Sequence, residues 1–201
     1  GVCPVRGHSN VQGDRTVGIT EHPSESFLKN LDQQFGISSP RNSGFNTVQT
    51  IKAMESKSVK VFMAMGGNFA RATPDSSRTE EALKKCDLTV QVTTKLNKSH
   101  LAHGKKALIL PCLGRSELDV QASGEQSVTV EDSMGAVHAS QGTNQPASAN
   151  LKSEVAIVAG MAKATFPENK KMWTVLQDDY RLIRDKIEAV LPELFSDYNR
   201  K

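Results

Sequence analysis

The sequence predicts an α/β fold built on a parallel β-sheet. Three short apolar segments, at residues 59–65, 88–92 and 106–111, have the length and composition of buried strands. Helical segments of about ten residues separate them. Strands that alternate with helices join through right-handed crossovers, so the three strands are expected to lie parallel in one sheet.

Helices are expected before, between and after these strands in the sequence. The clearest boundaries are Gly36, where a first helix should stop, and Asn46, which can cap a second one. The segment after the first strand has a capping-box pattern from Ser77 to Glu80. The helices are expected within residues 23–35, 47–54, 74–86, 95–104, 151–166 and 172–194, and the last is expected to be one long amphipathic helix.

A long polar, glycine-rich stretch interrupts this alternation at about residues 114–150. Short extended pieces such as 127–130 break it, so we expect an excursion that contains a hairpin. Loops of this length are usually functional or bound to a partner. With the excursion included, residues 1–201 are expected to form a single domain.

The composition is that of an ordinary globular protein. The chain has 25 Lys and Arg against 22 Asp and Glu, a net charge of +3 without a basic run, which argues against nucleic acid as a partner. No apolar stretch approaches the roughly 18 residues of a membrane span, and no signal-peptide pattern is present, so a cytoplasmic location is expected. Cys3, Cys86 and Cys112 are odd in number and far apart, which predicts reduced thiols.

The loops after the three strands should hold any ligand site. The carboxyl ends of parallel strands meet at one edge of an open sheet, which brings together the loops GGNFARATPD, TTKLNK and PCLGRSE. Gly66 and Gly67 let the backbone approach a ligand, and a helix that starts near Ser76 directs free N–H groups at the same place. A phosphate or diphosphate would suit this site, although such glycines can also serve only to make a turn. Neither the GxGxxG fingerprint nor the GK[ST] of a P-loop is present.

Other candidate side chains give weaker evidence for a metal site or a reactive group. His100 and His103 could share a helical face, but a third ligand is lacking, so a surface pair is favoured over a metal site. Cys112 follows the third strand and is expected to be a small buried residue. The residues by themselves therefore name no catalytic group.

Four segments, in order, resemble the molybdopterin oxidoreductases of the formate dehydrogenase and dimethyl sulfoxide reductase superfamily. PVRGHSNVQGDRTVG resembles the RG-x-x-NVQG segment of that family, and FMAMGGNFARATPDSSRTEEAL resembles its G-x-N-P…PD loop. ALILPCLGRSELD is similar to the family's strand followed by LP…E. Residues 128–165 are similar to the formate dehydrogenase-like alpha-subunit branch, so the resemblance covers nearly the whole chain.

The resemblance implies a Rossmann-like three-layer domain with a mostly parallel sheet, from the middle of a longer alpha subunit. Such a subunit holds molybdenum between two molybdopterin guanine dinucleotides (bis-MGD) and carries a 4Fe-4S cluster in its N-terminal part. It catalyses a two-electron redox reaction whose electrons leave through the cluster. The implied partners are the remaining domains of the parent chain and an electron-transfer protein, and the domain alone would be inactive.

The resemblance also implies cofactor-binding residues, position by position. The RG-x-x-N segment would approach the pterin, and the loop after the first strand would hold the nucleotide phosphates. The implied residues are Arg6, Gly7, His8 and Asn10 in the first segment, Gly66, Gly67, Asn68 and Thr73 in the second, and Thr93, Thr94 and Glu117 in the later loops. The metal ligand would lie upstream of residue 1.

Three positions depart from the family pattern. Phe69 stands where many members have proline, Thr93 where an aspartate is common, and Lys106 near the place where an aspartate often precedes the third strand. Guanine offers N1–H and N2–H donors, for which a carboxylate is the natural acceptor. Guanine selectivity would then depend on Asp75, Glu117 or another domain.

A fourth departure concerns His8, which replaces the glutamine of formate dehydrogenases. A histidine there could act as a proton relay or hydrogen-bond donor, so formate does not follow as the substrate. Two other functions stay open at this point. The chain could belong to a non-catalytic nucleotide-binding or regulatory protein, or to a scaffold whose excursion docks a partner. A cysteine quartet and a metal ligand upstream would favour the enzyme.

Overall fold

The computed structural model describes residues 10–200, which group into two compact units. The sheet unit consists of Phe45–Gly114 and Pro146–Ile157, and the helical unit consists of residues 10–44, Arg115–Gln145 and residues 158–200. The assignment of residues 1–201 to a single domain stays a prediction, because two compact units can belong to one domain. Each unit is described by itself.

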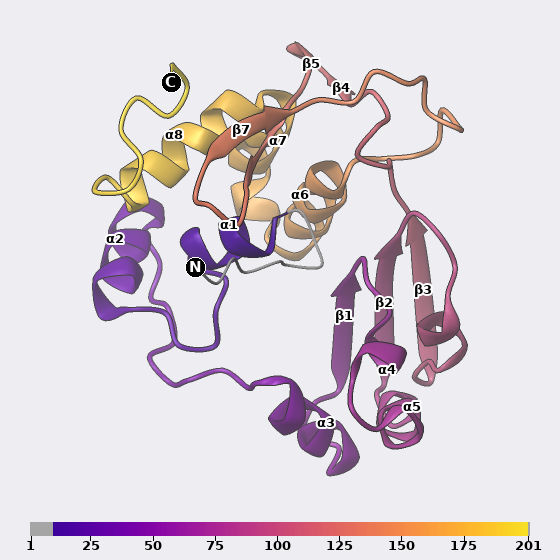
Figure 1. Cartoon of the computed structure of the whole chain (residues 1–201). Coiled ribbons are helices and arrows are strands. Elements are labelled where there is room, and N and C mark those ends of the chain that lie inside the picture. The colour runs from indigo at the N-terminus through magenta and orange to yellow at the C-terminus, as the bar shows by residue number, and fades with distance from the viewer. Residues whose placement is uncertain (1–9, 201) are drawn as a thin grey trace. The chain divides into compact units, whose positions relative to one another are not determined.

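The sheet unit confirms the predicted α/β fold. Its strands are β1 (Val61–Met65), β2 (Leu88–Thr93) and β3 (Lys106–Pro111), in the spatial order β1-β2-β3. Both pairings are parallel, so the three arrows in Figure 1 run in the same direction. Met63, Val90 and Leu108 are paired in register and therefore share one face of the sheet.

Helices and a hydrophobic cluster cover the opposite face of this sheet. The helices are α3 (Thr47–Glu55), α4 (Phe69–Ala72), α5 (Ser76–Lys84) and the 3-10 helix η1 (Lys98–Leu101). Phe62 of β1 packs against the cluster together with Phe69, and their rings lie 4.9 Å apart. The buried members of the cluster are Ile51, Met54, Ala70, Ala82, Leu83, Cys86 and Ala102.

The caps of α3 and α5 show how local sequence sets the ends of these helices. Asn46 forms the predicted cap of α3, and Gln49 completes a capping box with it. The predicted capping box from Ser77 to Glu80 is wrong, because Asp75 is the N-cap of α5 and accepts the Arg78 N–H. An aspartate two residues upstream of Ser77 offers a charged acceptor, which is the stronger cap for a helix N-terminus.

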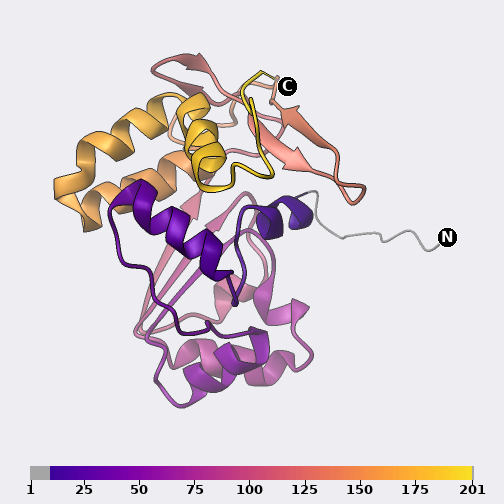
Figure 2. The ribbon, with the colours of Figure 1, turned by 90° about the vertical axis from the view of Figure 1, so that its left-hand side faces the viewer.

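The helical unit contains the excursion and the C-terminal helices (Figures 1 and 2). The predicted hairpin is present, since β6 (Val128–Glu131) pairs antiparallel with β7 (Val137–Ser140). The other elements are α1 (Val11–Thr16), α2 (Glu25–Phe35), β4 (Val120–Gln121), β5 (Gly124–Glu125), η2 (Pro167–Asn169), α7 (Lys170–Asp178) and α8 (Tyr180–Val190), while α6 (Glu154–Thr165) begins in the sheet unit. Gly36 ends α2 in the left-handed conformation, as predicted.

The predicted single helix over residues 172–194 is wrong, because α7 and α8 are separate. Asp179 between them is extended, with φ −148° and ψ 108°, and its side chain caps α8 by accepting the Arg181 N–H. The Tyr180 N–H donates to Gln126 Oε1 at 2.9 Å. This side chain takes the N–H that a continuous helix would have paired internally.

No helix within residues 10–200 is long and apolar enough to span a membrane.

An ion pair between α3 and α5 leads to a prediction about pH. The Arg78 guanidinium donates Nε and one terminal nitrogen to the two Glu55 carboxylate oxygens at 2.6 and 2.7 Å. These hydrogen bonds lower the Glu55 pKa below its usual value of 4.5. A lowered folded-state pKa adds stability above the unfolded-state pKa, and this stability is lost as pH falls through the folded-state pKa.

We therefore expect Glu55→Gln to reduce the urea midpoint at pH 7 by a small but constant amount down to about pH 5. The difference from the wild-type chain should shrink as the pH falls below 4.5 and disappear once the Glu55 carboxylate of the folded protein is protonated, which its lowered pKa places below pH 4.5. Urea titrations at pH 7, 5 and 3.5 measure this, and Glu168→Gln serves as a control at an exposed carboxylate that forms no ion pair within residues 10–200. A difference that grows towards low pH would contradict the ion-pair account.

Candidate functional site

The loops that follow β1, β2 and β3 leave the same edge of the sheet. The Gly66 N–H donates to the Val92 carbonyl at 2.8 Å, which ties the start of the first loop to the end of β2. The Cys112 N–H donates to the Thr93 carbonyl at 3.1 Å, which joins the third loop to the second in the same way. The three loops therefore lie at one edge of the sheet, as predicted.

The first loop opens with two glycines in the left-handed conformation. Gly66 has φ +69° and Gly67 has φ +72°, a region that other residues rarely adopt. A Cβ atom built at either position meets no heavy atom within 4 Å. In the described part of the chain, the backbone N–H groups of Gly67 and Asn68 have no hydrogen-bond acceptor. The loop therefore presents bare backbone donors to open space, which is suited to an anion.

The second loop and η1 hold this glycine loop in place. The Asn97 side-chain amide donates to the Gly67 carbonyl at 2.8 Å. The Ser99 hydroxyl donates to Asn68 Oδ1 at 2.8 Å and accepts the Ala70 N–H at 2.9 Å. Because Ser99 is buried, its bonds are shielded from water and stabilise the conformation of the glycine loop.

His100 stands behind this network and supports the second loop. It is buried, and its Nδ1 lies 2.9 Å from the Asn97 backbone nitrogen and 3.2 Å from the Asn97 carbonyl oxygen. Nε2 is buried and has no partner among the described residues. His103 is exposed, so the two histidines do not form the predicted surface pair. No group of three metal-ligating side chains occurs within residues 10–200.

Thr73 has a hydrogen-bond partner close to it in sequence, and its implied role at the nucleotide stays a prediction. Its hydroxyl is buried and lies 2.7 Å from the Thr79 hydroxyl. Thr79 donates its own hydrogen to the Asp75 carbonyl, so Thr73 is the donor in this pair. The hydroxyl therefore stabilises the turn before α5.

At the N-terminus of α5, one of the N–H groups that were expected to be free is engaged. The Asp75 carboxylate accepts one of them and places a negative charge at this helix end. A phosphate is repelled by that charge, so the backbone donors after β1 are the better anion site.

Thr93 and Thr94 follow β2 and differ in their accessibility. Thr93 is buried, and its hydroxyl donates to the Lys95 carbonyl at 2.7 Å, which makes it a turn-forming residue. Thr94 is exposed and is available to a ligand. Lys95 and Lys98 are exposed in the same segment and add positive charge to it.

Asn10 and Glu117 belong to the helical unit, so they are not brought together with the glycine loop within one unit. Asn10 Oδ1 accepts the Glu131 N–H at 3.0 Å. Glu117 pairs with Asn144 in a short parallel bridge, and Gly142 packs against the Glu117 backbone with no room for a Cβ atom. Arg6, Gly7 and His8, together with Cys3, lie outside the described residues.

Neither of the two cysteines within residues 10–200 forms a disulfide there, and both are buried. Burial raises the pKa of the Cys86 thiol, and the neighbouring Asp87 carboxylate raises it further. Cys86 is thus held as a neutral thiol within the core cluster. Cys112 is also buried, which agrees with its predicted role as a small packing residue.

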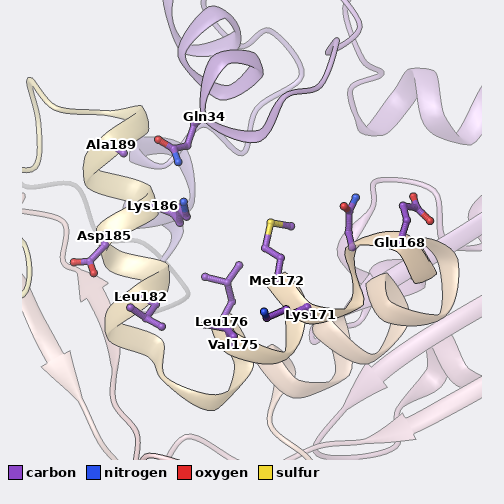
Figure 3. A pocket seen from close by; sticks show the side chains of 11 residues that line it. Gln34, Glu168, Lys171, Met172, Val175, Leu176, Leu182, Asp185, Lys186 and Ala189 are labelled. Atoms are coloured by element: carbon purple, nitrogen blue, oxygen red, sulfur yellow. The ribbon is translucent and has the colours of Figure 1, made fainter.

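An apolar groove of about 650 Å³ lies within the helical unit, between α2, α7 and α8 (Figure 3). Met172, Leu176 and Leu182 point into it, while the charged ends of Lys186 and Asp185 lie towards its margin. Of the predicted cofactor-binding residues that the structure describes, none lines this groove. It carries no cluster of groups suited to catalysis or to phosphate binding.

The residues that fasten the loop lead to a second prediction. Ser99→Ala leaves the buried Ala70 N–H and Asn68 Oδ1 without partners, and we expect it to lower the free energy of unfolding by about 1–3 kcal/mol. Ser77→Ala makes the same chemical change at an exposed residue of α5 and is expected to stay within about 0.5 kcal/mol of the wild type. Urea titration of the two variants measures the difference. Equal stability of both variants would show that the Ser99 hydroxyl does not hold the loop.

Comparison with known proteins links the chain to longer proteins. No protein-family model matches it. It is 57% identical over 202 aligned residues to an uncharacterized oxidoreductase of Mycobacterium bovis, and equally similar to one of Mycobacterium tuberculosis. It is 51% identical over 201 residues to the protein YdeP of Escherichia coli K12. In each case all of this chain is covered, but the chain spans only 26% of the relative's length.

Proposed function

We propose that this chain is part of a molybdopterin-dependent oxidoreductase of the formate dehydrogenase and dimethyl sulfoxide reductase type. In this proposal the sheet unit binds the diphosphate of one molybdopterin guanine dinucleotide at the loop from Gly66 to Asn68. The relatives named as oxidoreductases support a redox function of the longer protein. The four ordered motifs in the sequence favour this cofactor among redox cofactors.

One observation carries the proposal. Directly after β1, Gly66 and Gly67 are both left-handed, with open space where side chains would otherwise stand, and the backbone N–H groups of Gly67 and Asn68 have no acceptor within the described residues. In open α/β sheets, ligands bind at the carboxyl ends of the strands, where this loop lies. Backbone N–H groups without side chains in front of them can contact phosphate oxygens directly.

In this proposal the described residues have different roles at the site, since some would contact the cofactor and others position the loop. Gly67 and Asn68 would donate their backbone N–H groups to the phosphates, while Asn97 and Ser99 hold the loop in the binding conformation. Thr94 stands exposed on the neighbouring loop, where it could contact the nucleotide. These groups bind and orient the cofactor and take no part in electron transfer.

The acid that would recognise guanine is not assigned within the sheet unit. The Asp75 carboxylate is already engaged as the cap of α5, and Glu117 belongs to the helical unit. When bound, molybdenum and its pterins would supply the two-electron chemistry, and the implied iron–sulfur cluster would carry the electrons away.

The test uses the full-length protein, purified without oxygen. Molybdenum and iron are measured by elemental analysis, and the pterin and guanine nucleotide are released by acid and quantified by chromatography. We expect about one molybdenum and two guanine nucleotides per polypeptide. Absence of all of these from a folded protein prepared in cells that load a known molybdoenzyme would overturn the proposal.

A further inference from the structure

The outer edge of β1 has a composition that does not suit an edge strand. Its sequence, VFMAM, contains no charged residue and no proline, and it is apolar on both faces. Val61, Met63 and Met65 share one face and are 57%, 40% and 43% exposed. Strands that are apolar on both faces are typical of the interior of parallel sheets, whereas edge strands are usually protected by charges, proline or bulges.

Half of the backbone groups of β1 point away from the sheet. The Lys60 carbonyl accepts N–H groups from the start of β2, and the Gly66 N–H donates to Val92, so residues 60, 62, 64 and 66 face β2. Since strand residues alternate in direction, the N–H and C=O groups of Val61, Met63 and Met65 face outward. Within the described residues no strand pairs with them.

The outer edge of β3, at the other side of the sheet, differs from that of β1. β3 begins with Lys106 and ends with Pro111, and both residue types discourage pairing. Beyond Pro111 the chain already has a neighbour, because the Leu113 N–H donates to the Lys152 carbonyl at 3.0 Å. A bridge between Cys112 and Lys152 runs parallel there. β3 also exposes Leu108 and Ile109, but it carries a lysine and a proline, whereas β1 carries neither and has no such protection.

We infer that, in the full-length protein, a further strand pairs in parallel with the free edge of β1 and that its connections bury Met63 and Met65. The strand comes from the part of the polypeptide outside residues 1–201. Length permits this, because the curated relatives are about four times as long as the chain that matches them. An unpaired row of apolar residues and backbone groups would otherwise promote aggregation.

Such a strand has a consequence for the glycine loop. In the described chain the strand order follows the sequence without reversal. A strand from the part of the polypeptide that follows residue 201 would place a reversal of strand order at β1, and ligand crevices of open α/β sheets lie at such points. The crevice would open next to Gly66. The added strand is inferred from β1 alone and does not depend on the identity of the cofactor.

Methionine oxidation in the full-length protein tests the burial. Met54 is fully buried and Met134 is 77% exposed, so the chain contains its own slow and fast references. We expect Met63 and Met65 to be oxidised by hydrogen peroxide at least about tenfold more slowly than Met134 in the folded protein, and at the same rate as Met134 in urea. Oxidation of Met63 and Met65 as fast as Met134 in the folded protein would overturn the inference.

A benzophenone cross-linker placed at Met63 identifies what covers the strand. A cross-link to a peptide outside residues 1–201 of the same polypeptide supports the inference. A cross-link between two copies, lost on dilution, would overturn it, because two β1 edges related by a two-fold axis pair antiparallel. If Met63 is protected in a protein that contains no pterin, the added strand is supported and the proposed function is refuted. Failure of the one proposal can therefore be distinguished from failure of the other.

Discussion

Replacement of Leu83 by alanine is expected to lower the free energy of unfolding of the sheet unit by about 3 kcal/mol. Leu83 of α5 is fully buried in the cluster that packs on the sheet. Removing its branched end leaves a cavity between α5 and its neighbours, because helix and sheet cannot collapse around it completely.

Leu101→Ala is the matched control, since Leu101 is 74% exposed and lies in η1 of the same unit. Its effect should stay within about 0.5 kcal/mol. Urea titration followed by hydrogen exchange of the β2 peptide reports on the sheet unit separately from the helical unit. Equal losses in the two variants would mean that the Leu83 cluster does not form the core of this unit.

The strands were predictable because buried parallel strands are short, continuous apolar runs. β3 has the predicted bounds, Lys106–Pro111, and β2 extends one residue further than predicted, to Thr93. β1 begins at Val61 rather than at residue 59, because the preceding Val59 packs against the core before pairing begins. Apolar composition therefore finds a buried strand, but it does not mark where the ladder starts.

The break between α7 and α8 was not predictable from periodicity. Apolar residues recur at helical spacing on both sides of Asp179, so the pattern predicts one continuous helix across this residue. The interruption is stabilised by Gln126, which is 54 residues away in sequence and accepts the Tyr180 N–H. An aspartate in mid-helix is a weak signal by itself, and the tertiary bond decides the outcome.

In the candidate site, too, some residues could be predicted from the sequence and others could not. Gly66 and Gly67 were visible in the sequence because two glycines after a strand have a conformational meaning. Asn97 and Ser99, which fasten the loop, lie about 30 residues further along the chain and carry no motif. Their roles depend on the sheet that brings η1 beside the glycine loop, so only the structure reveals them.

The largest effect on cofactor binding is expected from Gly67→Val. The backbone at Gly67 has φ +72°, so any side chain strains it by about 1–2 kcal/mol. The valine side chain also occupies the open space through which a phosphate would reach the N–H groups of Gly67 and Asn68. We expect the molybdenum and guanine nucleotide content of the full-length protein to fall by at least about tenfold, which corresponds to a loss of about 1.4 kcal/mol in binding.

Gly36→Val separates strain from loss of the binding site. Gly36 ends α2 with φ +63° and likewise has no heavy atom within 4 Å of a built Cβ, so valine strains the backbone there to a similar degree. It lies in the helical unit, away from the proposed phosphate loop in sequence and in unit. Both variants should therefore lose similar thermal stability, but only Gly67→Val should lose cofactor. Equal cofactor content in the two variants, measured on folded protein, would place the dinucleotide elsewhere in the polypeptide.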